Sequence, residues 1–408
     1  TPLYSSAASD VYKRQVQWGE ASLKKLGADK VFLQECMMPN WKRGGKDLAA
    51  VVLQNGKKTN RSLDVLALGN SLGTGGKPLV AEVVAVQDFD EMEAKKDQLK
   101  GKIVYFNNKF NPTNIQTFKS YGEAGQYRRS GPSRAAKYGA VGVMIRSLTE
   151  ATDNNPHTGT TGYDEAFPKI PAIALGNYDA DYIWSITRNS SIKVSMTTNG
   201  SFGPDVVGHS VVAELTGTEF PNEYITVGGH LDSWDVNEGA HDDGAGIVQT
   251  IEIMRALKTL GYKPKRTLRF VLFANEENGM RGGNKYAEEA QKNKEKHVFA
   301  LESDAGGFTP RGFGFTVSAT QLSKIQTWLP LLKPYGTDFL QAGGGGADIG
   351  PLNKTFGTPI AGLMPDSQRY FDIHHARSDV FENVNKTELH LGAVNMAALI
   401  YLVDQYGL

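Results

Sequence analysis

Three apolar segments in the second half of the chain run directly into polar, titratable residues. They are EYITVGGHLD (223–232), TLRFVLFAN (267–275), which Glu276 and Glu277 follow, and HVFALESDAG (297–306). Segments with a helical pattern, 244–261 and 283–296, separate them. Nearly continuous apolar strands are typical of a parallel sheet that is covered on both faces, and alternating strands and helices are typical of the α/β class. We therefore expect a mostly parallel mixed sheet with helices on both faces.

A separate module is expected over residues 86–200. The charged segment DFDEMEAKKDQLKG marks its entry, and apolar segments at 101–107, 133–147 and 170–176 predict a small α/β domain. Its long polar loop, TEATDNNPHTGTTGYDEAFP, has no period. No cluster of titratable groups converges there, so the module is interpreted as an inserted spacer or lid without chemistry of its own.

The remaining sequence, 16–85 and 201–408, is then one discontinuous domain. The pattern from Val16 to Leu53 is helical, and a long helix is predicted to begin near Thr387. Residues 1–15 show no clear period and are interpreted as a disordered or artefactual tail.

Composition excludes several classes of protein. Lys and Arg together number 44, as do Asp and Glu, so no net charge favours nucleic acid or an acidic membrane. No apolar run reaches the ~20 residues that span a bilayer, and no signal peptide is visible. Cys36 is the single cysteine and cannot form an internal disulfide. Any metal site must therefore use histidine and carboxylate ligands.

Ligand-type residues stand at the ends of the three apolar segments and in two loops, one that enters a helix and one late in the chain. They are His230 and Asp232, Glu276 and Glu277, Asp304, the pair Asp242–Asp243, and the pair His374–His375. Each alone has an ordinary interpretation, such as a hydrogen-bonded turn, a helix cap or an exposed pair. The carboxyl ends of parallel strands meet at one edge of a sheet, however. Buried carboxylates that converge there repel one another and favour a bound cation, and this ligand set suits zinc, with manganese or cobalt as substitutes.

The carboxylates among these residues must serve two different purposes, metal binding and proton transfer. Two metals close together need a bridging carboxylate, and a hydrolytic site needs another carboxylate that is not a ligand and takes a proton from water. Neighbouring residues at a strand end point in different directions. Glu276 and Glu277 therefore suit a division into one base and one ligand.

Five ordered motifs resemble the co-catalytic zinc exopeptidases: GGHLDSWD, GAHDDGAG, FANEENGMRGG, ESDAG and HHARSD. This group contains bacterial leucyl aminopeptidases and glutamate carboxypeptidase II, and the motifs most resemble those of the carboxypeptidase Q group and its bacterial relatives. The resemblance is strong over residues 205–408 and implies a phosphorylase/hydrolase-like fold with two Zn²⁺. The 86–200 module resembles the protease-associated domain that such enzymes carry as an insert.

The resemblance implies a role for each motif residue. The implied metal ligands are His230, Asp242 as the bridge, Glu277, Asp304 and His375. Glu276 is the implied general base, and Asp232 is the carboxylate that orients the imidazole of His230. His375 is favoured over His374 as the last ligand because it lies four residues before Asp379. Relatives often have a cis peptide bond at the position of Asp242–Asp243.

Other residues near the motifs are assigned to the substrate or to the backbone. His374 is a candidate oxyanion donor, and Asp348 and Gly345 lie in GGGGADIGPL, which resembles the family's substrate-side loop; a flexible surface turn is the alternative. His241 is interpreted as a neighbour of the site, and Asp235 and Glu238 as ordinary turn residues.

The implied activity is hydrolysis of dipeptides or short peptides by an aminopeptidase or dipeptidase, with carboxypeptidase action left open. A water shared by the two metals would attack, with Glu276 as its base. Two alternatives are a glutaminyl cyclase-like acyltransferase on the same scaffold and a non-catalytic, receptor-like module. The complete ligand set and the retained Glu276 disfavour both. The resemblance also suggests a homodimer and a secreted or periplasmic location.

Overall fold

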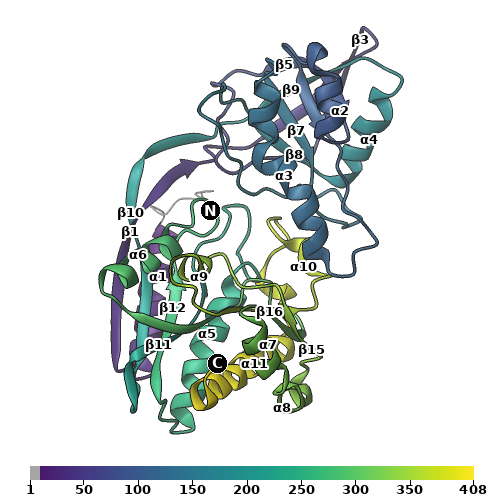
Figure 1. Cartoon of the computed structure of the whole chain (residues 1–408). Coiled ribbons are helices and arrows are strands. Elements are labelled where there is room, and N and C mark those ends of the chain that lie inside the picture. Colours follow the sequence, from purple (N-terminus) through teal and green to yellow (C-terminus); the bar gives the residue numbers. More distant parts are fainter. Residues whose placement is uncertain (1–9) are drawn as a thin grey trace.

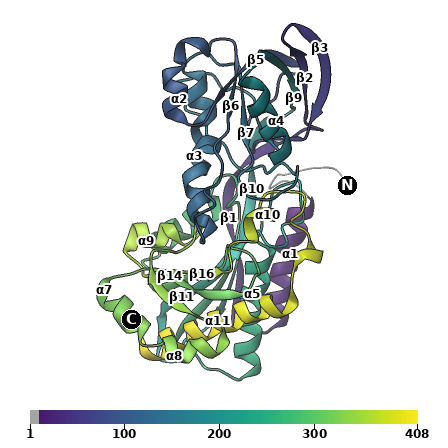
Figure 2. The same cartoon turned by 90° about the vertical axis from the view of Figure 1, so that its right-hand side faces the viewer.

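The computed structural model describes residues 10–408, which form two domains, each built on an eight-stranded sheet (Figure 1). The large domain contains the first helix and strand and the whole chain from residue 201 onward, and the small domain contains residues 48–197. Two long antiparallel strands, β1 (Lys30–Lys42) and β10 (Ser201–Leu215), lead from the large domain to the small one (Figure 2). The small domain is therefore an insertion between these two strands.

The large domain has a mixed sheet. Its order is β1, β10, β12 (Arg266–Phe273), β11 (Phe220–His230), β13 (Lys296–Glu302), β16 (Ile360–Pro365), β14 (Pro310–Thr316) and β15 (Phe339–Ala342). The central strands β12, β11, β13 and β16 are parallel, whereas β1 and β10 pair antiparallel with their neighbours. At the other edge, β14 is antiparallel to β16 and parallel to β15. The prediction of a mixed α/β sheet is confirmed.

Helices cover both faces of this sheet because its central strands are apolar on both sides. In β12, Phe270 packs with one core, to which α1 (Asp10–Lys25), α5 (Gly244–Thr259) and α11 (Lys386–Tyr406) contribute. Its neighbour Val271 packs with the opposite core, to which α6 (Arg281–Lys292) and α9 (Gly350–Phe356) contribute. Short helices α7 (Ala319–Gln326), α8 (Leu329–Leu332) and α10 (Tyr370–Ile373) complete the domain.

The small domain is also an α/β sandwich. Its sheet has the order β3 (Lys57–Leu63), β2 (Leu48–Gln54), β9 (Ile192–Thr197), β5 (Leu79–Val86), β6 (Ile103–Phe106), β7 (Gly142–Arg146), β8 (Ala172–Leu175) and β4 (Val65–Ala67). Helix α4 (Asn177–Thr187) packs on one face, and α2 (Phe89–Ala94) and α3 (Thr117–Ala136) pack on the other. The N-terminal end of α3 reaches α10 of the large domain, where Thr117 hydrogen-bonds to Ser367 (Figure 1).

The predicted helix over residues 16–53 is wrong beyond Lys25. Residues 30–42 and 48–54 are the strands β1 and β2. β1 pairs with β10 along nearly its whole length, from Lys30 opposite Glu214 to Lys42 opposite Ser201. A short apolar run suits either a helix or a strand. Here the pairing with β10, about 170 positions later in the sequence, makes the segment a strand.

The expected start of the insert at residue 86 is also too late. β2 and β5 both pair with β9, and β4 pairs with β8, so residues 48–86 belong to the small domain. The expected tail, 1–15, overlaps α1, in which Tyr12 is buried and its hydroxyl donates to the carbonyl of His209 (2.9 Å). Residues 1–9 of that tail lie outside the described residues. Within residues 10–408, no helix has the length and apolar character needed to cross a bilayer.

A buried ionic cluster joins β10, β12 and the segment before β13. Nε of Arg269 lies 2.8 Å from Oε1 of Glu214, and its Nη2 lies 3.0 Å from Oε1 of Glu295. Nε2 of His297 lies 3.1 Å from Oε2 of Glu295. Burial by itself raises the pKa of Glu295, but the hydrogen bonds from His297 and Arg269 outweigh it and lower the pKa to about 2.

We expect Glu295→Gln to lower the free energy of unfolding at pH 7 by about 1–3 kcal/mol, because Arg269 keeps its charge and loses one of its two carboxylate partners. Since the pKa of Glu295 falls on folding, its contribution is complete above pH 4.5 and is lost as the pH falls toward 2. Urea unfolding between pH 7 and pH 3 should therefore show a difference that shrinks in acid. Glu288→Gln, on the exposed side of α6, is the control. A difference that is constant with pH would contradict this account.

Candidate metal centre

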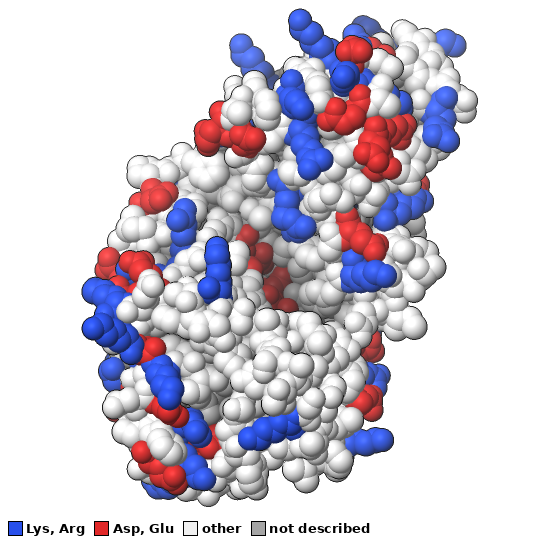
Figure 3. Space-filling model, viewed as in Figure 1, with Lys and Arg blue, Asp and Glu red and all other residues white. Residues whose placement is uncertain are grey.

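The predicted ligand-type residues meet at the carboxyl edge of the large sheet. His230 ends β11, Glu276 and Glu277 follow β12, and Asp304 follows β13. Asp242 precedes α5, and His374 and His375 follow α10. In the space-filling view, acidic side chains gather at the bottom of a hollow between the two domains (Figure 3). The convergence inferred from the three strand ends is therefore present in the fold.

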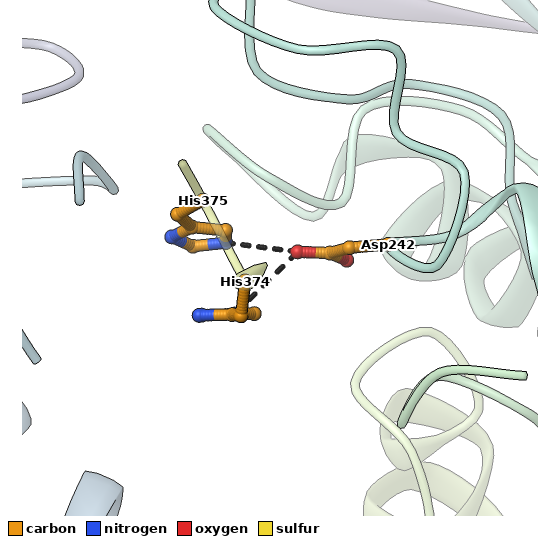
Figure 4. A group of neighbouring side chains, drawn as sticks. All are labelled: Asp242, His374 and His375. Atoms are coloured by element: carbon orange, nitrogen blue, oxygen red, sulfur yellow. Dashed lines mark ion pairs between the residues drawn. The ribbon is translucent and has the colours of Figure 1, made fainter. Parts of the chain in front are cut away.

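Asp242 lies at the centre of the cluster. Its Oδ1 is 3.3 Å from Nε2 of His230, and its Oδ2 is 3.1 Å from Nε2 of His375 and 3.4 Å from Nε2 of His374. Figure 4 shows both neighbouring imidazoles directed at this carboxylate. The two oxygens of one side chain thus serve two different groups of histidines, which is the arrangement that a bridging ligand requires.

The first group contains His230 and Asp304. Nε2 of His230 lies 3.5 Å from Oδ1 of Asp304. Burial lowers the pKa of His230, but the carboxylates of Asp242 and Asp304 outweigh it and raise the pKa well above 6.5. A positive charge is therefore stabilised between these carboxylates, whether a proton or a metal ion supplies it.

The second group contains His375 and Glu277. Nε2 of His375 lies 3.0 Å from Oε2 of Glu277. Burial, together with the nearby charge of Asp242, raises the pKa of Glu277 to about 7, although His375 opposes the rise. His374 stacks on His375, with ring centroids 3.6 Å apart, and its Nε2 lies 3.4 Å from Oδ2 of Asp242, compared with 3.1 Å for Nε2 of His375. The geometry therefore favours His375 over His374 as the ligand in this group.

The donor atoms fit a bound cation. Within the described chain, Nε2 of His230, Oδ2 of Asp242 and Oε1 of Glu277 are buried and have no hydrogen-bond partner. Leaving such atoms unsatisfied is costly. The groups Asp242–His374–His375 and His230–Asp243–Asp304 each place three ligand atoms within 4.8 Å of one another. Imidazole and carboxylate donors without thiolate suit zinc and similar divalent ions.

Asp232 contacts the imidazole of His230 through its backbone carbonyl and not, as predicted, through its carboxylate. Nδ1 of His230 donates to the backbone carbonyl of Asp232 (2.8 Å), whereas the nearest carboxylate oxygen is 3.8 Å away. The carboxylate instead accepts the backbone N–H groups of Glu276 (3.0 Å) and Glu277 (3.2 Å). Asp232 therefore positions the end of β12 with its side chain and the imidazole with its backbone.

Glu276 is half-buried, and its carboxylate has no hydrogen-bond partner within residues 10–408. Burial raises its pKa well above 4.5, and the negative charges of Asp304 and Glu277 add to the rise while His230 opposes it. A carboxyl group with a raised pKa accepts a proton more readily near neutral pH. Glu276 thus places an unpaired carboxylate with a raised pKa beside the cluster.

The backbone around Asp242 is held from several sides. Asp243 accepts the N–H of His230 (2.9 Å) and the N–H of Gly246 (2.9 Å), so it caps α5 and shapes the backbone as predicted. Asp379 accepts the N–H groups of His241 (2.8 Å) and Asp242 (3.1 Å). The expected cis peptide bond between Asp242 and Asp243 is present.

His241 does not belong to the candidate ligands. Its Nδ1 accepts the N–H of Gly307 (3.0 Å), and its Nε2 lies 3.2 Å from the carbonyl of Asn383. Its ring stacks on Phe308 with centroids 4.3 Å apart. Both ring nitrogens are therefore occupied by backbone groups away from Asp242.

A pocket of about 540 Å³ adjoins Asp304. Gly344, Gly345 and Gly346 line it together with the apolar residues Phe339, Leu363, Met364 and Pro365, and the small domain contributes Ile115, Gln116 and Phe118. Gly345 has a φ of +152°, and a Cβ there would lie 2.6 Å from Cδ1 of Ile360. The glycine loop thus forms a pocket wall, and the expected role of Gly345 toward substrate stays a prediction.

Asp348 does not line this pocket. Its side chain is fully buried, and neither carboxylate oxygen has a hydrogen-bond partner in the described part of the chain. Burial and the nearby charges of Glu302 and Glu276 raise its pKa well above 3.8. The structure therefore places Asp348 behind the pocket wall, and its expected role toward substrate stays a prediction.

The turn residue Asp235 has a role that the sequence did not indicate. Its buried carboxylate accepts two hydrogen bonds from Arg43, at Nε and Nη2, both 2.8 Å long. Nη1 of Arg43 also contacts Asp47 (3.1 Å), directly before the small domain, and the carbonyl of Ala67 (2.7 Å) within it. Arg43 thus fixes the loop between His230 and Asp242 to the small domain, and only the tertiary structure brings these residues together.

Trp234 occupies the same interface. A Cβ at Gly69 would lie 1.8 Å from its ring, so only glycine allows the observed contact. Its ring centroid is 6.2 Å from that of Trp41 and 5.9 Å from that of His375. The small domain therefore packs directly against the residues next to the cluster.

The mixed sheet and the histidine–carboxylate cluster at its carboxyl edge define a metal-dependent hydrolase. The family model "Peptidase family M28" matches residues 210–400. Carboxypeptidase Q of Xenopus laevis is 35% identical over 398 residues, which cover 97% of this chain and 82% of that protein. This chain belongs to peptidase family M28 and is a metallopeptidase.

Solved structures agree with this assignment. A peptidase M28 precursor from Shewanella amazonensis is 31% identical, with a TM-score of 0.91 over 99% of this chain and 90% of that one. A zinc aminopeptidase from Bacillus subtilis is 17% identical, with a TM-score of 0.66 over 96% of this chain and 89% of that one. The second likeness concerns the fold alone.

We expect Arg43→Met to lower the free energy of unfolding by about 3–5 kcal/mol, because two buried carboxylates, Asp47 and Asp235, lose their counter-charge. Arg61→Met is the matched control, since Arg61 is half-exposed and pairs with Asp179. The control should cost about 0–1 kcal/mol. Equal losses for the two variants in denaturant titrations would show that Arg43 is no stronger a connection than a surface ion pair.

Proposed function

We propose that this metallopeptidase is a two-zinc exopeptidase that hydrolyses dipeptides or short peptides, with Glu276 as the general base. The proposal depends above all on Asp242, whose two oxygens serve the His230 and His375 groups separately. His230, Asp304 and Asp242 would hold one ion, and His375, Glu277 and Asp242 would hold the other. Manganese or cobalt would be accepted by the same donors.

When bound, the two ions would supply Lewis acidity to the scissile carbonyl and lower the pKa of a water molecule. The chain's own residues would do the rest. Glu276 accepts the proton of the attacking water on its free carboxylate and returns it to the leaving amine. Asp232 keeps Glu276 in place through the backbone hydrogen bond of 3.0 Å.

His374 is proposed to stabilise the negative charge that develops on the carbonyl oxygen. Its ring is buried next to Asp242, and burial, with the adjacent His375, lowers its pKa well below 6.5. A neutral imidazole that donates one N–H group would suit this role.

The pocket beside Asp304 supports a preference for short substrates. The small domain contributes Ile115, Gln116 and Phe118 to its wall. The wall limits how far a peptide could extend in this direction. The apolar lining favours an apolar side chain in the pocket.

Two further features follow from relationship to the family rather than from the site. We propose a location outside the cytoplasm and assembly as a homodimer. Cell fractionation and light scattering test these two points separately from the chemistry.

Glu276→Gln should lower kcat by about 10²–10⁴-fold because it removes proton transfer, while two zinc ions stay bound per chain. Glu277→Gln should instead lose zinc, because it removes a ligand. Metal analysis and dipeptide hydrolysis, each with and without a chelator, measure both effects. Loss of metal in the Glu276 variant would reverse the two roles. Metal-loaded wild-type protein that releases no amino acid from any dipeptide would refute the exopeptidase proposal.

Met364→Trp should narrow the pocket and lower kcat/KM for dipeptides with a bulky apolar residue by about 10–200-fold, with little change for small residues. Met364→Leu, which has a similar volume, should retain the wild-type preference. The screen uses each dipeptide with a free and with a blocked N-terminus, which separates aminopeptidase or dipeptidase action from carboxypeptidase action. An unchanged preference in the Trp variant would exclude this pocket as the side-chain site.

A further inference from the structure

A short segment of the small domain, His157–Gly159, lies against the His374–His375 pair of the large domain. The backbone N–H of Thr158 donates to the carbonyl of His375 (3.0 Å). Nδ1 of His157 lies 2.6 Å from the carbonyl of His374. Burial lowers the pKa of His157 to about 4, so its ring is neutral and donates the Nδ1 proton to that carbonyl. Both histidine backbones are thus held by the small domain.

The side chain of His375 is held by the same segment. Its Nε2 faces Asp242 and Glu277, so in a metal-binding imidazole the proton resides on Nδ1. The carbonyl oxygen of Thr158 lies 3.3 Å from that Nδ1 and is its acceptor. Ligand histidines generally need such an acceptor to fix the ring and its tautomer.

Arg128 of α3 supports this contact. It is buried, and its Nη1 donates to the Thr158 carbonyl (3.4 Å). Nη1 also lies 3.4 Å from Nδ1 of His375, but both nitrogens carry protons in this tautomer, so they do not hydrogen-bond to each other. Its Nη2 donates to the hydroxyl of Tyr121 (2.6 Å), whose ring packs edge-on against His374 with centroids 5.1 Å apart. The guanidinium therefore fixes the Thr158 carbonyl next to the ring of His375.

Gly159 makes this close approach possible. Its φ is +127°, and a Cβ there would lie 2.3 Å from Nη1 of Arg128 and 2.7 Å from Nδ1 of His375. No other residue would leave both groups in place. Oγ1 of Thr158 also donates to the carbonyl of Ala67 (2.8 Å), the oxygen that Arg43 contacts. The segment is thereby connected to the Arg43–Asp235 ion pair.

We propose that Arg128 and the Thr158 carbonyl are positioning groups for His375, so that the small domain completes the half of the metal centre formed by His375 and Glu277. The inference rests on the proposed two-zinc function. Removing an outer hydrogen-bond partner of a ligand histidine typically lowers metal affinity by about 10–100-fold. The small domain is then part of the catalytic apparatus rather than a spacer.

The test measures zinc stoichiometry and affinity by chelator competition in the full chain, with Arg128→Met and the exposed neighbour Arg129→Met as control. Arg128→Met should bind zinc about 10–100-fold more weakly at one of two sites and normally at the other. Its kcat should recover in excess zinc. Arg129→Met should match the wild type.

A second pair of variants covers the case in which Arg128→Met does not fold. Gly159→Ala introduces a methyl group against His375 and should weaken the same single site. Gly162→Ala is the control, because the nearest atom to its added Cβ lies 3.5 Å away. Cobalt absorption spectra of the half-loaded proteins identify which site is affected.

The outcomes separate the two proposals. Wild-type protein that binds no zinc, or only one ion, refutes the two-zinc function. Wild-type protein that binds two ions while Arg128→Met and Gly159→Ala bind both as tightly refutes only the role of the small domain. Equal weakening of zinc binding at both sites also refutes it, because a general loss of structure produces that result and a specific contact with His375 does not.

Discussion

The carboxylate of Asp242 is the group on which the rest of the site depends. It is buried between His230 on one side and the His374–His375 pair on the other, within a few ångströms of Glu277. A carboxylate that is buried beside another carboxylate is stable in its ionised form only when positive charge lies next to it. The surrounding backbone is fixed by hydrogen bonds, since Asp379 accepts a hydrogen bond from the N–H of Asp242 and Asp243 caps the helix that follows. The remaining candidate ligands reach it because three parallel strands end at the same edge of the sheet.

The small domain extends this arrangement rather than standing apart from it. Arg43, at the start of the insertion, holds Asp235 in the loop between His230 and Asp242. Thr158 and Arg128 approach His375 from the other side. Phe118 and its neighbours form one wall of the pocket beside Asp304. A rigid body movement of this domain would therefore change ligand orientation and pocket shape together.

The strand ends and their ligand-type residues were predictable because the signals are local. In the central strands of the large sheet both faces are buried, so each strand is a continuous apolar run, and the first polar residue after it marks the edge of the sheet. The segment from Lys30 to Lys42 was not predictable in the same way. Its apolar residues suit a helix or a strand, and its pairing with β10 decided between them. The domain boundary was missed for the same reason, since β2 and β5 find their partner in β9, more than a hundred residues later.

The sequence by itself determined the α/β class, the candidate ligands His230, Asp242, Glu277, Asp304 and His375, and the likeness to zinc exopeptidases. These follow from residue type and order along the chain. Only the tertiary structure decided that the carboxylate of Asp232 holds the backbone of Glu276 and Glu277, that Asp348 is buried, and that Asp235 pairs with Arg43. It also brought Arg128 and Thr158 to His375 across more than two hundred residues. The physical reason is that hydrogen bonds and ion pairs depend on distances in space, which sequence order does not contain.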